Sequence, residues 1–244
     1  MMTTFLTFHK NSEKRFQDNK LSNEFESNPL MTSLYFADMA YFSPTFIHKS
    51  LYALGATYLS VYNKDNTQAF FAEFDKFAVV GFRGNEIDKL HEIKTDILCW
   101  KTEYEGIDCH KGFVDLIGFV SRRILLDIEE LNPKKKLLFT GHSLGGALAT
   151  LFALKCKPTH LFTFGSPRVT GGEAAREKLH GIEYLRVSIE SDLISRMPPE
   201  FFGYEHFGES LILPGVDGLY NSHKLRTYIQ KVSEHADVQP TLAT

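Results

Sequence analysis

The sequence has few cysteines and no long apolar run. Its three cysteines, Cys99, Cys109 and Cys156, cannot all pair within the chain and lack the spacing of a disulfide framework, so a disulfide-stapled fold is excluded. No apolar run is long enough to span a bilayer, and the N-terminus lacks the apolar core of a secretory signal. We therefore expect a soluble, cytoplasmic protein with reduced thiols, unless a route that needs no leader exports it.

The chain also lacks an excess of charge of either sign. It has 27 basic and 30 acidic residues, a formal net charge of −3, and its compact basic run at residues 134–136 precedes a predicted strand as part of a turn. Binding to nucleic acid depends on a basic surface. A nucleic-acid partner is therefore not expected.

The apolar content is sufficient for one large domain. With 43% hydrophobic residues in a chain of 244, a sizeable core can form, and no repeat or linker-like stretch divides the sequence. Residues 1–28 are polar and aperiodic and are predicted to form a loosely held N-terminal arm. The domain is expected to cover residues 29–235, followed by a tail at 236–244.

Apolar periodicity predicts strands first and then an alternation of helices and strands. A helix at 30–41 precedes a hairpin at 57–62 and 69–74 and a buried strand at 77–82. Later helices are predicted at 112–131, 145–155, 172–180 and 222–234, and later strands at 137–140, 160–164, 184–189 and 210–213. This order predicts an α/β fold with a mainly parallel central sheet, helices on both faces and an active site at the carboxyl ends of the strands.

The most informative segment passes from a predicted strand directly into a small-residue helix. Its centre, Gly141-His142-Ser143-Leu144-Gly145, has the G-x-S-x-G pattern of a nucleophile elbow. Strand and helix approach closely in such a turn, so Gly141 and Gly145 must lack side chains. The alternative is a glycine-rich turn whose serine caps the helix. The flanking strand and helix favour Ser143 as a nucleophile.

A serine nucleophile needs a base and usually an acid that orients the base. In this class of fold the acid follows the serine in the chain and the histidine comes last. The acid is expected just after the strand at 184–189, where Asp192 is favoured and Glu190, which adjoins the strand end, is the alternative.

Three histidines follow the candidate acid. His223 opens the last predicted helix after a glycine-containing loop, a position from which a side chain can reach across the strand ends. It is favoured over His206, which approaches the last strand, whereas His235 lies in a polar tail. A buried or capping role is the alternative for either of the first two.

Donors for a tetrahedral oxyanion are expected from two places. One is the backbone N–H of Leu144, directly after the nucleophile, and the other is the loop after the strand at 77–82, which contains Asn85. Asn85 could equally be an ordinary turn residue, and Arg83 a structural ion-pair residue beneath the loop.

Together these residues resemble the class 3 lipases, the fungal-lipase-like branch of the α/β-hydrolases. The resemblance implies Ser143 as nucleophile, Asp192 as acid and His223 as base, and it implies that His206 is not catalytic. The matching motifs, in order along residues 30–228, are Val80-Gly81-Phe82-Arg83-Gly84, His110-Lys111-Gly112-Phe113, Thr140 to Ala147, Thr163 to Val169, Asp192 with Pro198-Pro199, Tyr204 to Gly208, and His223 with Tyr228.

The resemblance has implications for the oxyanion donor at residue 85 and for the segment that follows it. The family usually has serine or threonine where this chain has Asn85, so the backbone N–H is expected to serve the oxyanion, while the amide side chain has a longer reach. In lipases of this family a helical lid comes next. Here Ile87, Leu90, Ile93 and Ile97 share one helical face. A lid that opens at a lipid surface is our hypothesis, and a permanently docked surface helix is the alternative.

The sequence thus predicts a serine carboxylic-ester hydrolase that cleaves fatty-acyl esters of acylglycerols, with a lipid or ester partner at a lipid–water interface. A phospholipase A1 or a feruloyl-type esterase of the same fold is the alternative substrate class, and a catalytically silent binding scaffold is the rival from another class. No cofactor or metal is expected, because Cys99, Cys109 and His110 match no zinc-ligand spacing.

Overall fold

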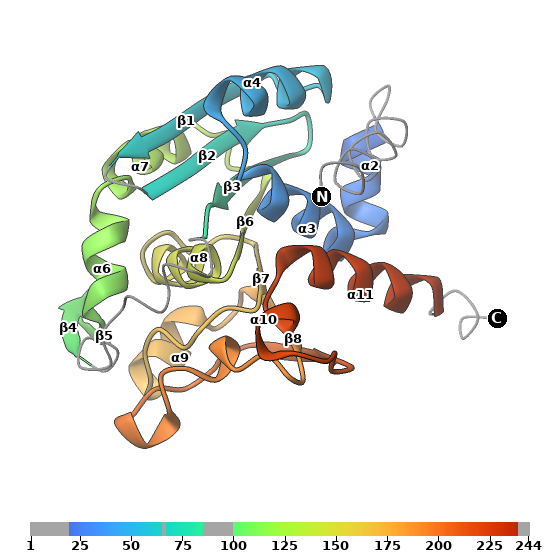
Figure 1. Cartoon of the computed structure of the whole chain (residues 1–244). Coiled ribbons are helices and arrows are strands. Elements are labelled where there is room, and N and C mark those ends of the chain that lie inside the picture. The colour runs from blue at the N-terminus through green and yellow to red at the C-terminus, as the bar shows by residue number, and fades with distance from the viewer. Residues whose placement is uncertain (1–19, 65–66, 85–99, 239–244) are drawn as a thin grey trace.

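A mixed sheet forms the centre of the protein. The computed structural model describes residues 20–64, 67–84 and 100–238, and within them seven strands pair in the order β1-β2-β3-β6-β7-β8-β9 (Figure 1). The strands are β1 (Tyr58–Lys64), β2 (Thr67–Glu73), β3 (Phe77–Phe82), β6 (Lys136–His142), β7 (His160–Phe164), β8 (Glu183–Ile189) and β9 (Glu209–Leu213).

The first three strands are antiparallel and the others are parallel. β1, β2 and β3 form a meander, and β3 then pairs with β6 in parallel, as β6 does with β7, β7 with β8 and β8 with β9. Carboxyl ends of parallel strands meet at one edge of the sheet, so the segments that follow β6 and β8 lie near one another there. The predicted α/β fold with a mainly parallel sheet is confirmed.

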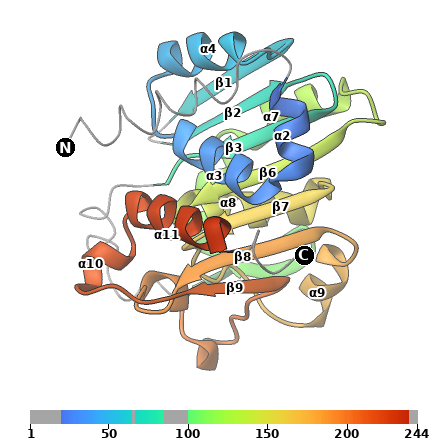
Figure 2. The same ribbon diagram turned by 90° about the vertical axis from the view of Figure 1, so that its right-hand side faces the viewer.

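Helices cover both faces of the sheet. One face carries α2 (Lys20–Ser27), α3 (Pro29–Met39), α4 (Pro44–Ala53) and α11 (Leu225–Val238), and the other carries α6 (Lys111–Gly118), α7 (Ser121–Glu129), α8 (Leu144–Cys156) and α9 (Glu173–Leu179). Figure 2 shows the first set in front of the strands. Side chains alternate along a strand, so Val80 of β3 joins one apolar core and Val79 the other.

Local sequence explains where the first helices begin. Asn28 accepts a hydrogen bond from the Met31 N–H at 3.1 Å, and Pro29 occupies the first turn of α3, where no backbone donor is needed. Ser43 caps α4 in the same way, with Pro44 at the start of that helix. Both helices thus begin with a capping side chain and a proline.

The structure differs from the sequence expectations in several elements. The helix predicted at 112–131 is two helices, α6 and α7, and the one predicted at 222–234 is α10 (Leu219–Ser222) followed by α11. Helix α4, which buries only Ile47 and Leu51, and the hairpin of β4 (Lys101–Tyr104) and β5 (Ile107–His110) were not predicted. Few buried residues per turn or strand leave a weak periodic signal.

Part of the predicted loose N-terminal arm is ordered against the sheet. Residues 20–27 form α2, whose Phe25 is 2% exposed and stacks on Phe77 with ring centroids 4.7 Å apart. This aromatic side chain helps to dock the helix on the sheet, because a phenylalanine buries a large apolar area.

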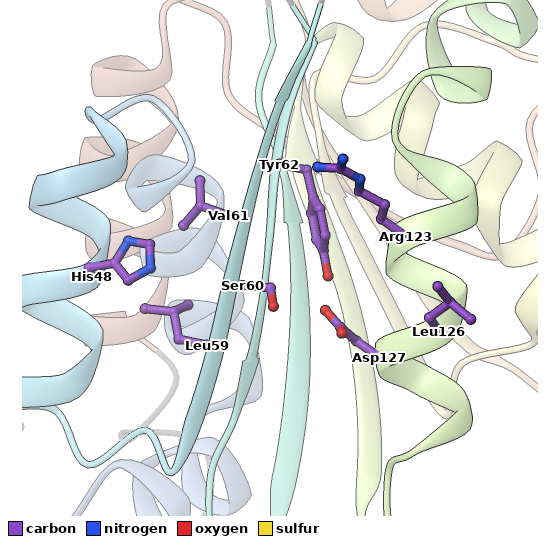
Figure 3. A pocket seen from close by; sticks show the side chains of 8 residues that line it. All are labelled: His48, Leu59, Ser60, Val61, Tyr62, Arg123, Leu126 and Asp127. Carbon is purple, nitrogen blue, oxygen red and sulfur yellow. The ribbon is translucent and has the colours of Figure 1, made fainter.

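A cavity of about 450 Å³ lies at the β1 edge of the sheet. Ser60 and Tyr62 project towards α7, whereas Leu59 and Val61 lie on the side of α4 (Figure 3). The hydroxyl of Tyr58 links Ser60 to Asp127 of α7, with distances of 2.9 and 3.0 Å. Of the predicted site residues that the structure describes, none lines this cavity, so we describe the candidate site from its hydrogen bonds instead.

Candidate active site

Ser143 occupies a strained turn between β6 and α8. Its backbone has φ 58° and ψ −129°, a conformation that a residue with a side chain rarely adopts and that costs of order 1–3 kcal/mol. A Cβ on Gly145 would lie 2.1 Å from the Phe82 carbonyl oxygen, and one on Gly141 would lie 2.3 Å from the Gly145 carbonyl carbon. The glycines of the motif are therefore required by the close approach of strand and helix.

The structure brings Ser143, His223 and Asp192 into one hydrogen-bonded row. His223 Nε2 lies 2.7 Å from Ser143 Oγ, and His223 Nδ1 lies 2.8 Å from Asp192 Oδ2. Ser143 follows β6, Asp192 follows β8, and His223 lies between α10 and α11. The three side chains are 0%, 2% and 0% exposed in the order serine, histidine, aspartate, so their interactions operate with little competition from water.

The alternative acid and base lie elsewhere. Glu190 is exposed, and its backbone rather than its carboxylate is engaged, with the N–H bonded to the Leu213 carbonyl at 2.9 Å. His206 Nε2 lies 2.7 Å from the Ser195 carbonyl oxygen, outside the row that contains Ser143. The geometry therefore selects Asp192 and His223.

Asp192 is held by more than His223. The Ile194 N–H donates to its Oδ1 at 2.9 Å, and the Tyr228 hydroxyl donates to its Oδ2 at 2.6 Å. Burial by itself raises the pKa of Asp192, but the hydrogen bond and charge of His223 together with the Tyr228 hydroxyl hold it below its ordinary value. Asp192 is therefore ionised at neutral pH. The sequence had assigned Tyr228 no role, because a tyrosine on an amphipathic helix face is ordinarily a core residue.

The loop after Asp192 is fixed by Arg168, which follows β7. Its guanidinium donates to the Pro198 carbonyl at 3.0 Å, to the Arg196 carbonyl and to the Glu200 carboxylate at 2.7 Å. Its backbone N–H also bonds to the Met197 carbonyl at 2.7 Å. These contacts hold the segment that carries the acid against the end of the neighbouring strand.

His142 lies beside the base and is kept neutral. Burial, and next the charge of His223, lowers the pKa of His142 to about 3. Its Nε2 lies 2.9 Å from the His223 carbonyl oxygen and its Nδ1 lies 2.8 Å from the Tyr41 hydroxyl. Neither His142 nor Tyr41 was a candidate from the sequence, because their partners are distant along the chain.

One expected oxyanion donor can be described in this structure. Leu144 is the first residue of α8, so its N–H has no acceptor within the helix and lies at the positive end of the helix dipole. The other expected donor, Asn85, lies outside the described residues. The same holds for the four residues of the lid hypothesis, Ile87, Leu90, Ile93 and Ile97.

Two histidines make the stability of the fold depend on pH. Burial, with the charge of Arg186 next, lowers the pKa of His206 to about 4, and that of His142 is about 3. Below pH 6.5 these two histidines are protonated in the unfolded chain but remain neutral in the folded protein. Their contribution to the free energy of unfolding is therefore fully present above pH 6.5 and is lost as the pH falls. From pH 7 to pH 5 we expect the free energy of unfolding to fall by about 2 kcal/mol per histidine.

Urea unfolding at the two pH values, followed by circular dichroism, measures this loss. Between pH 7 and pH 5 the free energy of unfolding of His206→Gln should fall by about 2 kcal/mol less than that of the parent chain. Equal losses in the two proteins would show that His206 titrates normally when folded.

The fold and the row formed by Ser143, His223 and Asp192 define an α/β-hydrolase. Residues 79–202 match the family described as Lipase (class 3). The chain belongs to the class 3 lipase family, as the sequence motifs predicted.

Curated relatives and solved structures agree with this membership. The chain is 38% identical over 117 residues to a lipase of Rhizomucor miehei, covering 43% of this chain and 32% of the relative. It is 37% identical over 119 residues to the secreted mono- and diacylglycerol lipase 1 of Fusarium solani, covering 45% and 35%. The chain thus spans about a third of the length of these curated relatives.

A solved triacylglycerol lipase has a similar fold over a longer stretch. It is described as having a serine protease triad as its catalytic centre, and it is 28% identical to this chain. The TM-score is 0.64, and the superposition covers 77% of this chain and 80% of the other.

The expected cytoplasmic location is wrong. The relative from Fusarium solani is named as secreted, which points to an extracellular rather than a cytoplasmic location. The expectation rested on the composition of the first residues of this sequence, which does not establish where the protein is located. Within the described residues, no helix has the length and apolar content needed to cross a membrane.

Proposed function

We propose that this chain is a serine carboxylic-ester hydrolase of the lipase type, which cleaves fatty-acyl esters of acylglycerols. The observation that carries the proposal is the continuous row of hydrogen bonds from Ser143 Oγ through His223 to Asp192. The class 3 lipase family and relatives named lipase and mono- and diacylglycerol lipase support the choice of substrate.

In the first half of the reaction Ser143 is acylated. His223 Nε2 takes the proton of Ser143 Oγ as this oxygen attacks the ester carbonyl carbon. The negative charge moves to the carbonyl oxygen, which the N–H groups of Leu144 and Asn85 receive. Asp192 stabilises the imidazolium of His223. The tetrahedral species then breaks its bond to the alcohol, and His223 gives the proton to the leaving oxygen.

In the second half water releases the fatty acid. His223 Nε2 takes a proton from water as the water oxygen attacks the acyl carbon bound to Ser143 Oγ. The second tetrahedral species breaks its bond to Ser143 Oγ, which recovers the proton from His223. Fatty acid and free enzyme result, and no redox step occurs.

Substrate class is tested with a panel of esters. The parent chain and Ser143→Ala are compared on p-nitrophenyl esters of increasing acyl length, a triacylglycerol, phosphatidylcholine vesicles and methyl ferulate. We expect acylglycerol and p-nitrophenyl esters to be cleaved fastest by the parent chain. Preferential release of the acyl group from phosphatidylcholine would indicate a phospholipase A1, and preference for methyl ferulate a feruloyl-type esterase.

The same panel tests the two remaining hypotheses. Rates on a triacylglycerol, measured below and above its solubility limit, should rise at the interface if residues 86–97 act as a lid, and a flat response would contradict a moving lid. Equal rates for the parent chain and Ser143→Ala on every substrate would favour a catalytically silent binding scaffold.

A further inference from the structure

A second row of hydrogen bonds reaches His223 at its backbone carbonyl oxygen. It runs from the Tyr41 hydroxyl to His142 Nδ1 at 2.8 Å, and from His142 Nε2 to the His223 carbonyl oxygen at 2.9 Å. Asp192 holds the ring of His223, whereas this row holds its backbone. The two imidazoles lie against each other, with ring centroids 5.0 Å apart.

The direction of this row follows from its acceptor. A carbonyl oxygen only accepts, so His142 Nε2 carries the proton. Because the ring is neutral, its Nδ1 has a free lone pair and accepts from the Tyr41 O–H. Tyr41 thereby fixes the tautomer of His142, and His142 in turn donates to His223.

Gly84 directs the hydroxyl of Tyr41 towards His142. The Gly84 backbone hydrogen-bonds to this hydroxyl, and a Cβ on Gly84 would lie only 2.2 Å from the Tyr41 oxygen. Because the Gly84 N–H donates to the Tyr41 oxygen, the Tyr41 O–H is free to donate to His142 Nδ1. The same Cβ would lie 2.5 Å from the His142 carbonyl oxygen. Gly84 therefore packs closely against both the Tyr41 hydroxyl and the backbone of the nucleophile elbow.

Two hydrogen bonds hold the His223 backbone: its N–H donates to the Asn221 carbonyl, and its carbonyl oxygen accepts from His142. His223 follows the four-residue helix α10 and precedes α11, with φ −89° and ψ −9°, so it lies at a joint between two helices. A displacement of about 1 Å in a reacting group can lower the rate of a reaction about 100-fold. The buried His142 donor on the His223 carbonyl oxygen adds a backbone restraint to the two hydrogen bonds of the His223 ring.

We propose that Tyr41 and His142 are positioning residues that hold His223 over Ser143, with Tyr41 acting through His142. This inference rests on the proposed ester hydrolysis. Neither residue is proposed to contact the substrate. Removing the Tyr41 hydroxyl should therefore slow the chemical steps and leave substrate binding unchanged.

The variant Tyr41→Phe tests the proposal. On p-nitrophenyl butyrate we expect kcat to fall about tenfold, which corresponds to about 1.4 kcal/mol, with an unchanged KM. The matched control is Tyr184→Phe, which removes a buried hydroxyl bonded to Thr150 at 3.1 Å, outside this row. The control should keep the parent kcat, and the two variants should have similar melting temperatures.

A double-mutant cycle tests the route through His142. The variant His142→Gln can still donate to the His223 carbonyl but presents no ring nitrogen to Tyr41. In that background Tyr41→Phe should lower kcat less than threefold, because coupled residues are not additive. A tenfold loss in both backgrounds, a change in KM alone, or a kcat for Tyr41→Phe within twofold of Tyr184→Phe would each overturn the proposal.

Ser143→Ala separates this inference from the proposed function. If the parent chain hydrolyses esters and Ser143→Ala does not, the function stands and the cycle alone judges Tyr41 and His142. If the parent chain is inactive, or Ser143→Ala keeps the parent rate, the proposed function fails and the positioning role fails with it.

Discussion

Ser143→Ala is expected to lower kcat for ester hydrolysis by about a factor of 10⁶ while the fold is retained. The substitution removes the oxygen that attacks the ester, and within the described residues Ser143 supplies the hydroxyl at hydrogen-bond distance from His223 Nε2. The backbone bond from the residue 143 N–H to the Phe164 carbonyl, at 2.9 Å, is unaffected. Initial rates on p-nitrophenyl butyrate measure the loss, with circular dichroism to show that the variant is folded.

Ser33→Ala is the matched control for this experiment. Ser33 is also fully buried, but its hydroxyl donates to the Pro29 carbonyl at 2.6 Å within α3. This control should keep the parent kcat. A Ser143→Ala variant with more than about 1% of the parent rate would mean that another group is the nucleophile, because a lost serine nucleophile lowers kcat far more than that.

Asp192→Asn is expected to lower kcat by about a factor of 10⁴, because the amide selects the wrong tautomer of His223. The part-buried backbone N–H of Ile194, 2.9 Å from Oδ1, cannot reorient and requires an acceptor there. The asparagine oxygen therefore takes that position and its NH₂ faces His223 Nδ1. His223 Nε2 then carries a proton and cannot accept the one from Ser143.

The Tyr228 hydroxyl does not prevent this orientation. It can rotate to accept from the new NH₂ group, whereas the backbone N–H of Ile194 cannot change its role. Asp115→Asn is the control, since Asp115 is exposed and pairs only with Lys111, at 2.7 Å, in the described structure. Both variants are compared with the parent chain by kcat and melting temperature. A fall of less than tenfold in Asp192→Asn would show that the carboxylate does not set the tautomer.

The nucleophile could be predicted because its signal is local. Gly141, Ser143 and Gly145 lie within five residues, and a Cβ on Gly141 would clash with the backbone of Gly145 inside the same turn. Asp192 and His223 followed from the order of functional groups along this class of fold. The structure then placed both at hydrogen-bond distance in the row that begins at Ser143.

The supporting residues could not be found in this way. Tyr228, His142 and Tyr41 act through hydrogen bonds to groups 36, 81 and 101 residues away along the chain. Nothing in the spacing of an aromatic residue on an apolar helix face shows where its hydroxyl will donate. Such partners are fixed by tertiary packing, which a periodic pattern does not encode.

The break between α6 and α7 has a similar cause. Ile117 and Ile124 are both fully buried and seven residues apart, so one continuous helix fits the apolar pattern as well as two. Only the three-dimensional path of the chain over the sheet shows that the helix ends near residue 118 and begins again at Ser121.

Covalent labelling of Ser143 tests the central claim most directly. A p-nitrophenyl dialkyl phosphate should form a bond between its phosphorus and Ser143 Oγ with release of p-nitrophenolate, in a step that needs His223 and the oxyanion donors. Peptide mass mapping should find one label per chain, on Ser143, formed far more slowly in Asp192→Asn. Labelling at another residue, or continued ester hydrolysis by a chain with fully labelled Ser143, would contradict the account.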